Sequence, residues 1–169
     1  MARTFNEFIR LFGVDELPDA EALKRPGAEK DPFSSVVKIG KRYFYDPKGL
    51  LKLAQEKHWD AFSVGLYLGE EKGDFRPTSA LIDLLAARSE KRVMVGSKAA
   101  WLYLCGRDIL MDGALRPGDY VRDELVFVVD SEGEILGYGR IFANYDSKLR
   151  NKIYVKHQLD KGEYLRRER

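Results

Sequence analysis

The sequence predicts an α/β (α+β) N-terminal domain over residues 1–90, followed by a mixed β pseudo-barrel domain over residues 91–169. Helical and strand patterns are interspersed in the first part of the chain. The second part has many short strand patterns joined by turns with Gly or Pro, and a single strongly apolar helix among them. Near Glu90 the charge density rises and the apolar period is lost, so we place the domain boundary there.

The first part predicts three helices and several strands. The apolar residues of Thr4–Phe12 repeat at helical spacing, and Asp46 followed by Pro47 is typical of a helix start. Residues 14–33 contain three prolines and no sustained period, which indicates an irregular segment. The remaining elements expected are a hairpin over Val36–Tyr45, a strand over Phe62–Gly69, a charged turn over Glu70–Asp74 and a helix that starts at Pro77–Ser79.

The second part predicts a small barrel of strands with one helix. Ser97 is expected to cap a helix over Lys98–Leu104, which is apolar on nearly every side and therefore mostly buried. Gly137 and Gly139 interrupt a strand pattern, which is typical of a bend in a barrel strand. The strands expected are Arg92–Val95, Leu125–Val129 and Ile135–Phe142, with turns at Arg116–Asp119 and Asp130–Gly133.

Composition and charge indicate a folded intracellular protein with a basic C-terminal end. Hydrophobic residues make up 44% and charged residues 33%, and the net charge is +2. The single cysteine, Cys105, excludes an intrachain disulfide, and we expect it to be a small buried hydrophobic residue. No signal pattern or apolar stretch of membrane-spanning length is evident, so we expect no membrane association and a cytoplasmic location, or a nucleolar one in a eukaryote.

A cationic stretch near the C-terminus is the main candidate for a binding site. Residues 147–158 contain no Asp or Glu, and apolar residues alternate there with charged ones. In a strand, Leu149, Ile153 and Val155 would point into a core and the opposite face would carry the cations and one aromatic ring. Such a face suits a polyanion, although it is also compatible with an ordinary amphipathic strand whose solvated side is basic. The predicted binding residues of this face are Lys148, Arg150, Lys152, Tyr154 and Lys156.

The sequence gives no support for catalysis, for a metal site or for a cofactor. His58 and His157 are the two histidines, and neither has a second ligand at metal-binding spacing. Two further residues are candidates for contact with a nucleic-acid backbone. Lys98 lies in the first turn of the predicted apolar helix, and Arg107 lies just after its end.

The second part resembles a PUA domain, the RNA-binding pseudo-barrel named after pseudouridine synthases and archaeosine transglycosylases. The opening strand and helix up to Cys105, the Arg116–Asp119 turn and the hairpin of Val128–Ile141 carry this resemblance. The ending KHQLDKGEYLRRE over Lys156–Glu168 and the phrase FRPTSALIDLL over Phe75–Leu85 are similar to those of the Nip-seven family, factors for large ribosomal subunit biogenesis. The basic stretch is typical of archaeal members of that family.

The resemblance implies a non-enzymatic RNA-binding assembly factor that acts on precursor ribosomal RNA. It implies Lys152 and Lys156 as the best matches to the RNA-contacting positions of archaeal members, and other ribosome assembly or exosome-type proteins as candidate further partners. The alternative is a PUA-bearing subunit or relative of an RNA-modification enzyme of the pseudouridine synthase or tRNA-guanine transglycosylase type. That alternative requires a catalytic carboxylate in the N-terminal domain, for which Asp60 and Asp83 are the candidates.

Overall fold

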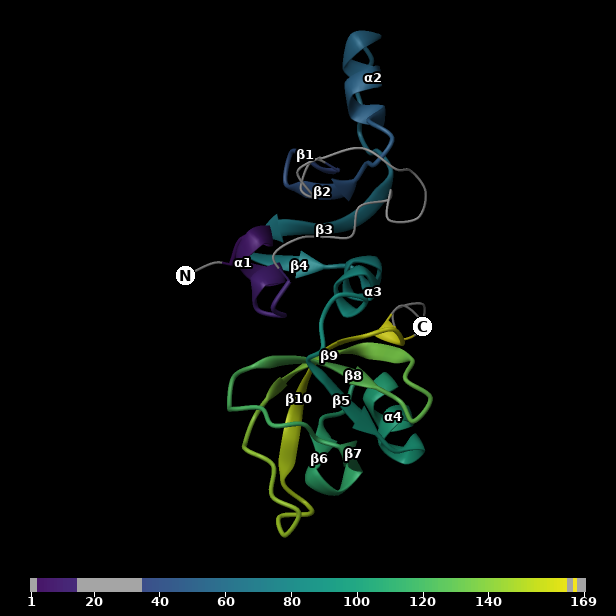
Figure 1. Ribbon diagram of the computed structural model, residues 1–169. Coiled ribbons are helices and arrows are strands. Elements are labelled where there is room, and N and C mark those ends of the chain that lie inside the picture. The colour runs from purple at the N-terminus through teal and green to yellow at the C-terminus, as the bar shows by residue number, and fades with distance from the viewer. Residues whose placement is uncertain (1–2, 15–34, 164–165, 167–169) are drawn as a thin grey trace, which may run out of the picture. The chain divides into compact units, whose positions relative to one another are not determined.

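The computed structural model describes residues 3–14, 35–163 and 166. The chain divides into two compact units, Met1–Arg88 and Ser89–Arg169 (Figure 1). Apart from Val14, the segment 14–33 that was predicted to be irregular lies outside the described residues. Among those residues the longest helices have eight residues, and none is long and apolar enough to cross a bilayer.

The first unit is built on an antiparallel sheet with the strand order β1-β2-β3-β4. The strand predicted over Phe62–Gly69 begins later and continues to Lys72, because the predicted charged turn is a tight hairpin at Gly73 whose two sides pair in register. The strands are β1 (Val36–Ile39), β2 (Arg42–Tyr45), β3 (Leu66–Lys72) and β4 (Asp74–Pro77).

The helices of the first unit are α1 (Phe5–Arg10), α2 (Leu50–Glu56) and α3 (Ser79–Ala86). Thr4 and Glu7 form a capping box at the start of α1. Asp46 accepts hydrogen bonds from the backbone N–H groups of Leu50 and Leu51, so it caps α2 as predicted, although the helix begins after Gly49 and not at Pro47. Helix α2 buries none of its side chains, whereas α1 and α3 pack apolar faces into the core.

Glu71 joins helix α1 to the sheet. Its carboxylate accepts hydrogen bonds from the Phe5 backbone N–H, the Tyr43 hydroxyl and the Lys38 ammonium group, at 3.2, 2.7 and 2.6 Å. The hydrogen bond from Lys38 is the main cause that holds the pKa of Glu71 below its ordinary value. The Phe5 ring stacks on the Tyr43 ring with centroids 4.7 Å apart, so polar and aromatic contacts fix the same helix.

The second unit is a nearly closed pseudo-barrel with the strand order β6-β10-β9-β8-β5-β7. All pairs are antiparallel except β5 with β8. The predicted fold class, an α/β unit followed by a mixed β pseudo-barrel, is therefore confirmed. The elements are β5 (Arg92–Val95), α4 (Ser97–Leu104), β6 (Ile109–Leu110), the 3-10 turn η2 (Met111–Gly113), β7 (Ala114–Arg116), β8 (Leu125–Val129), β9 (Ile135–Ile141) and β10 (Ile153–Asp160).

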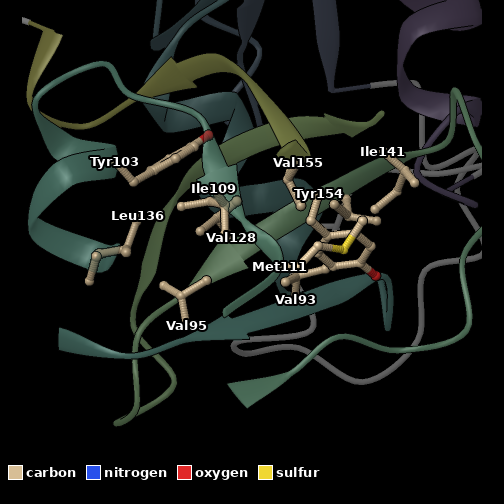
Figure 2. Close-up of a cluster of buried hydrophobic side chains, with 12 residues drawn as sticks. Val93, Val95, Tyr103, Ile109, Met111, Val128, Leu136, Ile141, Tyr154 and Val155 are labelled. Atoms are coloured by element: carbon tan, nitrogen blue, oxygen red, sulfur yellow. The ribbon is translucent and has the colours of Figure 1, made fainter. Parts of the chain in front are cut away.

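The buried side chains of the barrel core come from β5, β6, β8, β9 and β10, from helix α4 and from the turn η2 (Figure 2), and Ala114 of β7 packs against them. Tyr103 enters this cluster from α4 and is fully buried. Helix α4 was predicted to be buried on nearly every side, and that prediction is wrong, because only Ala100 and Tyr103 are buried while Trp101 is 65% exposed. Cys105, expected to be buried, is exposed just after the helix. The helix starts after Gly96, so Ser97 is its first residue and not its cap.

A buried carboxylate holds the end of the chain against the barrel. The side chain of Asp160 is fully buried and accepts two hydrogen bonds from Arg166, at 2.9 and 2.6 Å, and one from His157 at 2.5 Å. Arg166 also donates to the carbonyl of Leu104 at the end of α4. Burial raises the pKa of Asp160, but the hydrogen bonds from Arg166 and His157 outweigh it and leave the pKa below its ordinary value.

We expect Asp160→Asn to lower the free energy of unfolding by about 2–3 kcal/mol, because it leaves Arg166 and His157 beside a neutral group. Glu132→Gln, an exposed acid in a turn of the same unit, should change it by less than about 0.5 kcal/mol. Urea denaturation followed by circular dichroism measures both. Equal stabilities of the two variants would contradict a stabilising role for Asp160.

The effect of Asp160→Asn should also depend on pH. A carboxyl group whose pKa is lowered on folding stabilises the protein above its unfolded pKa of about 3.9 and loses that contribution as the pH falls through the folded value. The difference in stability between wild type and Asp160→Asn should therefore shrink as the pH falls below about 4. A stability difference that increased on acidification would contradict this prediction.

Candidate nucleic-acid interface

A pocket of about 480 Å³ opens on the second unit between helix α4 and the β6–η2–β7 segment. Its walls are the first turn of α4, the strand β6, the turn η2 and one side chain from the loop before β10. Apolar side chains form much of the lining, and five polar ones join them. The polar side chains are Ser97, Lys98, Asp108, Asp112 and Asn151.

The pocket exists because helix α4 approaches the end of η2 very closely. A Cβ atom on Gly113 would lie 2.9 Å from the Cβ of Ala99, a distance that real side chains essentially never adopt. The Gly113 carbonyl also accepts a hydrogen bond of 3.0 Å from the Gly96 N–H at the start of the helix. The glycine therefore places the first turn of α4, and Lys98 with it, at the edge of the pocket.

The loop before β10 supplies three exposed cations, Lys148, Arg150 and Lys152, which we call the basic loop. Its backbone is fixed at both ends. The Asp146 carboxylate accepts from the Lys148 N–H at 2.9 Å, and the carbonyls of Arg150 and Lys152 accept from the N–H groups of Asp112 and Met111 at 3.2 and 2.9 Å. None of the three cations forms an ion pair with another described residue, so the loop presents uncompensated positive charge.

The charges around the pocket are of both signs. Lys98 lies in the first turn of α4, which carries no acidic residue, so its charge adds to the positive end of the helix dipole. Asp108 and Asp112 face the same pocket, and Asp108 accepts a hydrogen bond of 2.8 Å from the His157 N–H. Cations of this kind bind phosphates, and carboxylates can accept hydrogen bonds from the amino groups of bases.

The structure brings some of the predicted residues together and separates others. Lys98 lies at the pocket, and the basic loop is bonded to η2, which forms one of its walls. Arg107 is exposed beyond the far end of α4 and does not line the pocket. Lys156 is exposed on β10, where it pairs with Arg140 of β9. The continuous cationic strand predicted over residues 148–156 is wrong, because β10 begins only at Ile153.

Tyr154 was predicted to lie among the cations, and this placement is wrong. Its side chain is fully buried, and its hydroxyl donates to the Pro117 carbonyl at 2.6 Å. Burial raises the pKa of Tyr154 above its ordinary value. A shift in register between Ile153 and Val155 breaks the alternation, so Tyr154 and Val155 are both buried. Leu149, expected in the core, is 46% exposed because it lies in the loop.

Sequence reasoning missed several residues of this surface. Asn151 lines the pocket but is uncharged, and the charge pattern did not single it out. Asp108 and Asp112 were not singled out either, because their spacing in the sequence does not show that both face this pocket. The signal for Tyr154 was present in the sequence: Ile153-Tyr154-Val155 is an uninterrupted apolar run, which alternation does not explain.

The carboxylates considered for catalysis lie apart from this pocket. Asp60 and Asp83 are both exposed in the first unit and do not line it. Over residues 3–14, 35–163 and 166, no group of three His, Cys, Asp or Glu side chains is arranged to hold a metal ion.

Comparison with known proteins finds similarity over the second unit. Residues 91–169 match the family described as the UPF0113 PUA domain. A UPF0113 protein of Archaeoglobus fulgidus is 32% identical over 109 residues, which cover 63% of this chain and 63% of the relative's length. A conserved PUA domain protein from Thermoplasma acidophilum aligns with a TM-score of 0.52 at 19% identity over 79% of each chain. A PUA domain from Aeropyrum pernix K1, solved with tartrate, aligns with a TM-score of 0.46 at 16% identity over 59% of this chain and 58% of that one.

The residues that match the PUA family, 91–169, are those that form the pseudo-barrel of the second unit, and the structural likeness is to the same fold. The narrower resemblance to the Nip-seven family remains a prediction.

Tyr154→Phe tests the corrected position of this residue. Loss of the hydrogen bond to the Pro117 carbonyl should lower the free energy of unfolding by about 1 kcal/mol. The affinity for single-stranded RNA should stay within about twofold of wild type, because the hydroxyl that the substitution removes is bonded inside the protein and cannot contact RNA. Denaturation and fluorescence-anisotropy titrations measure the two effects. A loss of RNA affinity without loss of stability would place the hydroxyl on the binding surface after all.

Proposed function

We propose that this protein is a non-catalytic RNA-binding protein, which binds single-stranded RNA through the basic loop and the α4 pocket of its PUA domain. One observation carries the proposal: three exposed cations stand on a loop whose backbone is hydrogen-bonded to the wall of a partly apolar pocket. Cations bind phosphates by releasing condensed counterions, irrespective of sequence. A pocket beside them adds a place for an unpaired base.

The pocket has the size and chemistry for such a base. About 480 Å³ lies within the range of sites that hold small organic ring systems. Leu102, Ile109 and Leu115 supply apolar walls, while Asn151 and the two aspartates supply groups for hydrogen bonds. Bases in an RNA duplex are already stacked and paired, so this arrangement favours single strands, loops and ends.

We further propose that the RNA is precursor ribosomal RNA and that the protein acts as an assembly factor of the large ribosomal subunit. The resemblance of Lys156–Glu168 and Phe75–Leu85 to the Nip-seven family supports this role. Other assembly or exosome-type proteins would then be its protein partners. The alternative of an RNA-modification enzyme is less well supported, because Asp60 and Asp83 are both solvent-exposed.

Neutralising the basic loop should weaken RNA binding. We expect Lys148→Gln/Arg150→Gln/Lys152→Gln to lower the affinity for single-stranded RNA at least about tenfold near 0.1 M salt, because three phosphate contacts are lost. The slope of log K against log salt concentration should become shallower by about 2, since each phosphate contact contributes roughly 0.7 on single strands. Fluorescence anisotropy at four or five salt concentrations gives both quantities.

The matched control is Lys48→Gln/Lys52→Gln/Lys57→Gln, which removes the same charge from exposed positions of the first unit. Its affinity should stay within about threefold of wild type. If the two triple variants lost affinity equally, binding would follow net charge and not the basic loop.

The fluorescence of the two tryptophans of the chain, Trp59 and Trp101, can locate the bound RNA. Trp101 is 65% exposed and lies one turn after Lys98 on α4, and Trp59 is 67% exposed in the first unit. In Trp59→Phe, RNA should quench the remaining Trp101 emission, because the bound RNA strand would pass the first turns of helix α4. In Trp101→Phe the emission of Trp59 should not change. The opposite pattern would move the interface to the first unit.

A further inference from the structure

An exposed aromatic ring with two cations beside it lies on the outer surface of the barrel, outside the α4 pocket. Phe142 follows the last residue of β9, and 43% of its surface is exposed. The Arg122 guanidinium carbon lies 5.5 Å from the centroid of its ring, and the Lys156 ammonium nitrogen lies 6.0 Å from it. Neither Phe142 nor these two cations line the pocket. Three separate segments of the chain therefore meet at one exposed ring.

The backbone sets this arrangement. Ile141 is fully buried, so the next side chain, Phe142, points to the opposite, outer side of the sheet. The Phe142 N–H donates to the Tyr154 carbonyl at 2.8 Å. The segment that carries Arg122 is bonded to β9 by the Asp123 N–H, which donates to the Ile141 carbonyl at 2.8 Å. The cluster is thus positioned by main-chain hydrogen bonds.

The cluster carries positive charge that no ion pair among the described residues neutralises. Arg140, which pairs with Lys156 across β9 and β10, lies 4.0 Å from the Asp123 carboxylate. Within the described part of the chain, Arg122 and Lys156 form no ion pair. Contacts between cations and an exposed ring stabilise only weakly, and the like charges repel one another. A ligand with a flat ring and an anionic group on each side would complement the cluster.

We propose that Phe142, Arg122 and Lys156 form a subsite for one unpaired nucleotide of an RNA single strand. The base stacks on the ring of Phe142, and the phosphates on either side of it contact Arg122 and Lys156. This inference rests on the proposed function and extends it, because it adds a contact outside the pocket and the basic loop. It also restricts this part of the RNA to a single strand, since a paired base cannot reach the ring.

The test is Phe142→Leu, which keeps an apolar side chain and removes the aromatic face. Its affinity for a single-stranded oligonucleotide should fall at least about fivefold, as expected for one lost stacking contact. The salt slope should stay unchanged, because no charge is removed. Lys156→Gln should instead make the slope shallower by about 0.7. Phe142→Trp should restore the affinity, and the affinity for duplex RNA should be equal in wild type and Phe142→Leu.

Phe62→Leu is the matched control. Phe62 is 74% exposed in the first unit, and the guanidinium carbon of Arg42 lies 4.7 Å from its ring centroid, so it resembles Phe142 in exposure and in its cationic neighbour. Its affinity for RNA should equal that of wild type. An equal loss in Phe62→Leu and Phe142→Leu, or no loss in Phe142→Leu, would overturn the subsite.

The same titrations separate this inference from the proposed function. If the basic-loop variant loses affinity and Phe142→Leu does not, the subsite is wrong and the proposed function stands. If wild type does not bind single-stranded RNA, both are wrong.

Discussion

The buried hydroxyl of Tyr103 ties helix α4 to the barrel where β9 and β10 lose their regular pairing. A register shift between His157 and Leu159 interrupts the ladder, and the hydroxyl lies 2.6 Å from the Tyr138 carbonyl and 3.1 Å from the Leu159 carbonyl. Buried carbonyls without donors are costly. Burial raises the pKa of Tyr103 well above its ordinary value, so the hydroxyl keeps its proton and remains a donor. The wall of the pocket depends on this anchor.

Glycines set how closely the barrel segments approach each other. A Cβ atom on Gly139 would lie 2.8 Å from the Lys156 carbonyl, and one on Gly113 would meet Ala99. The first contact lets β10 pair closely with β9, and the second brings α4 against η2. Close backbone contacts therefore position both the segments that line the pocket and those that carry the outer cluster at Phe142.

Local patterns predicted most elements of the fold and only part of the site. The apolar runs that became β5, β8 and β9 are strong strand signals, and Asp46 bonds the first turn of α2 as its position indicated. Strict alternation failed at Tyr154, because the register shift depends on the partner strand and the run Ile153-Tyr154-Val155 alone does not show where it falls. Trp101 was wrongly predicted to be buried, because an apolar helix has the same sequence pattern whether the barrel covers one side of it or all sides. Which cations meet at Phe142 depends on long-range pairing.

The hydrogen bonds that hold the basic loop have a thermodynamic consequence. A mobile loop would lose about 1–2 kcal/mol of backbone conformational entropy for each residue that a ligand orders. Here Asp146, Met111 and Asp112 already fix the backbone that carries the three cations. That entropy was lost when the domain folded. The free energy of counterion release would therefore increase the affinity for a nucleic acid without being offset by the cost of ordering this loop.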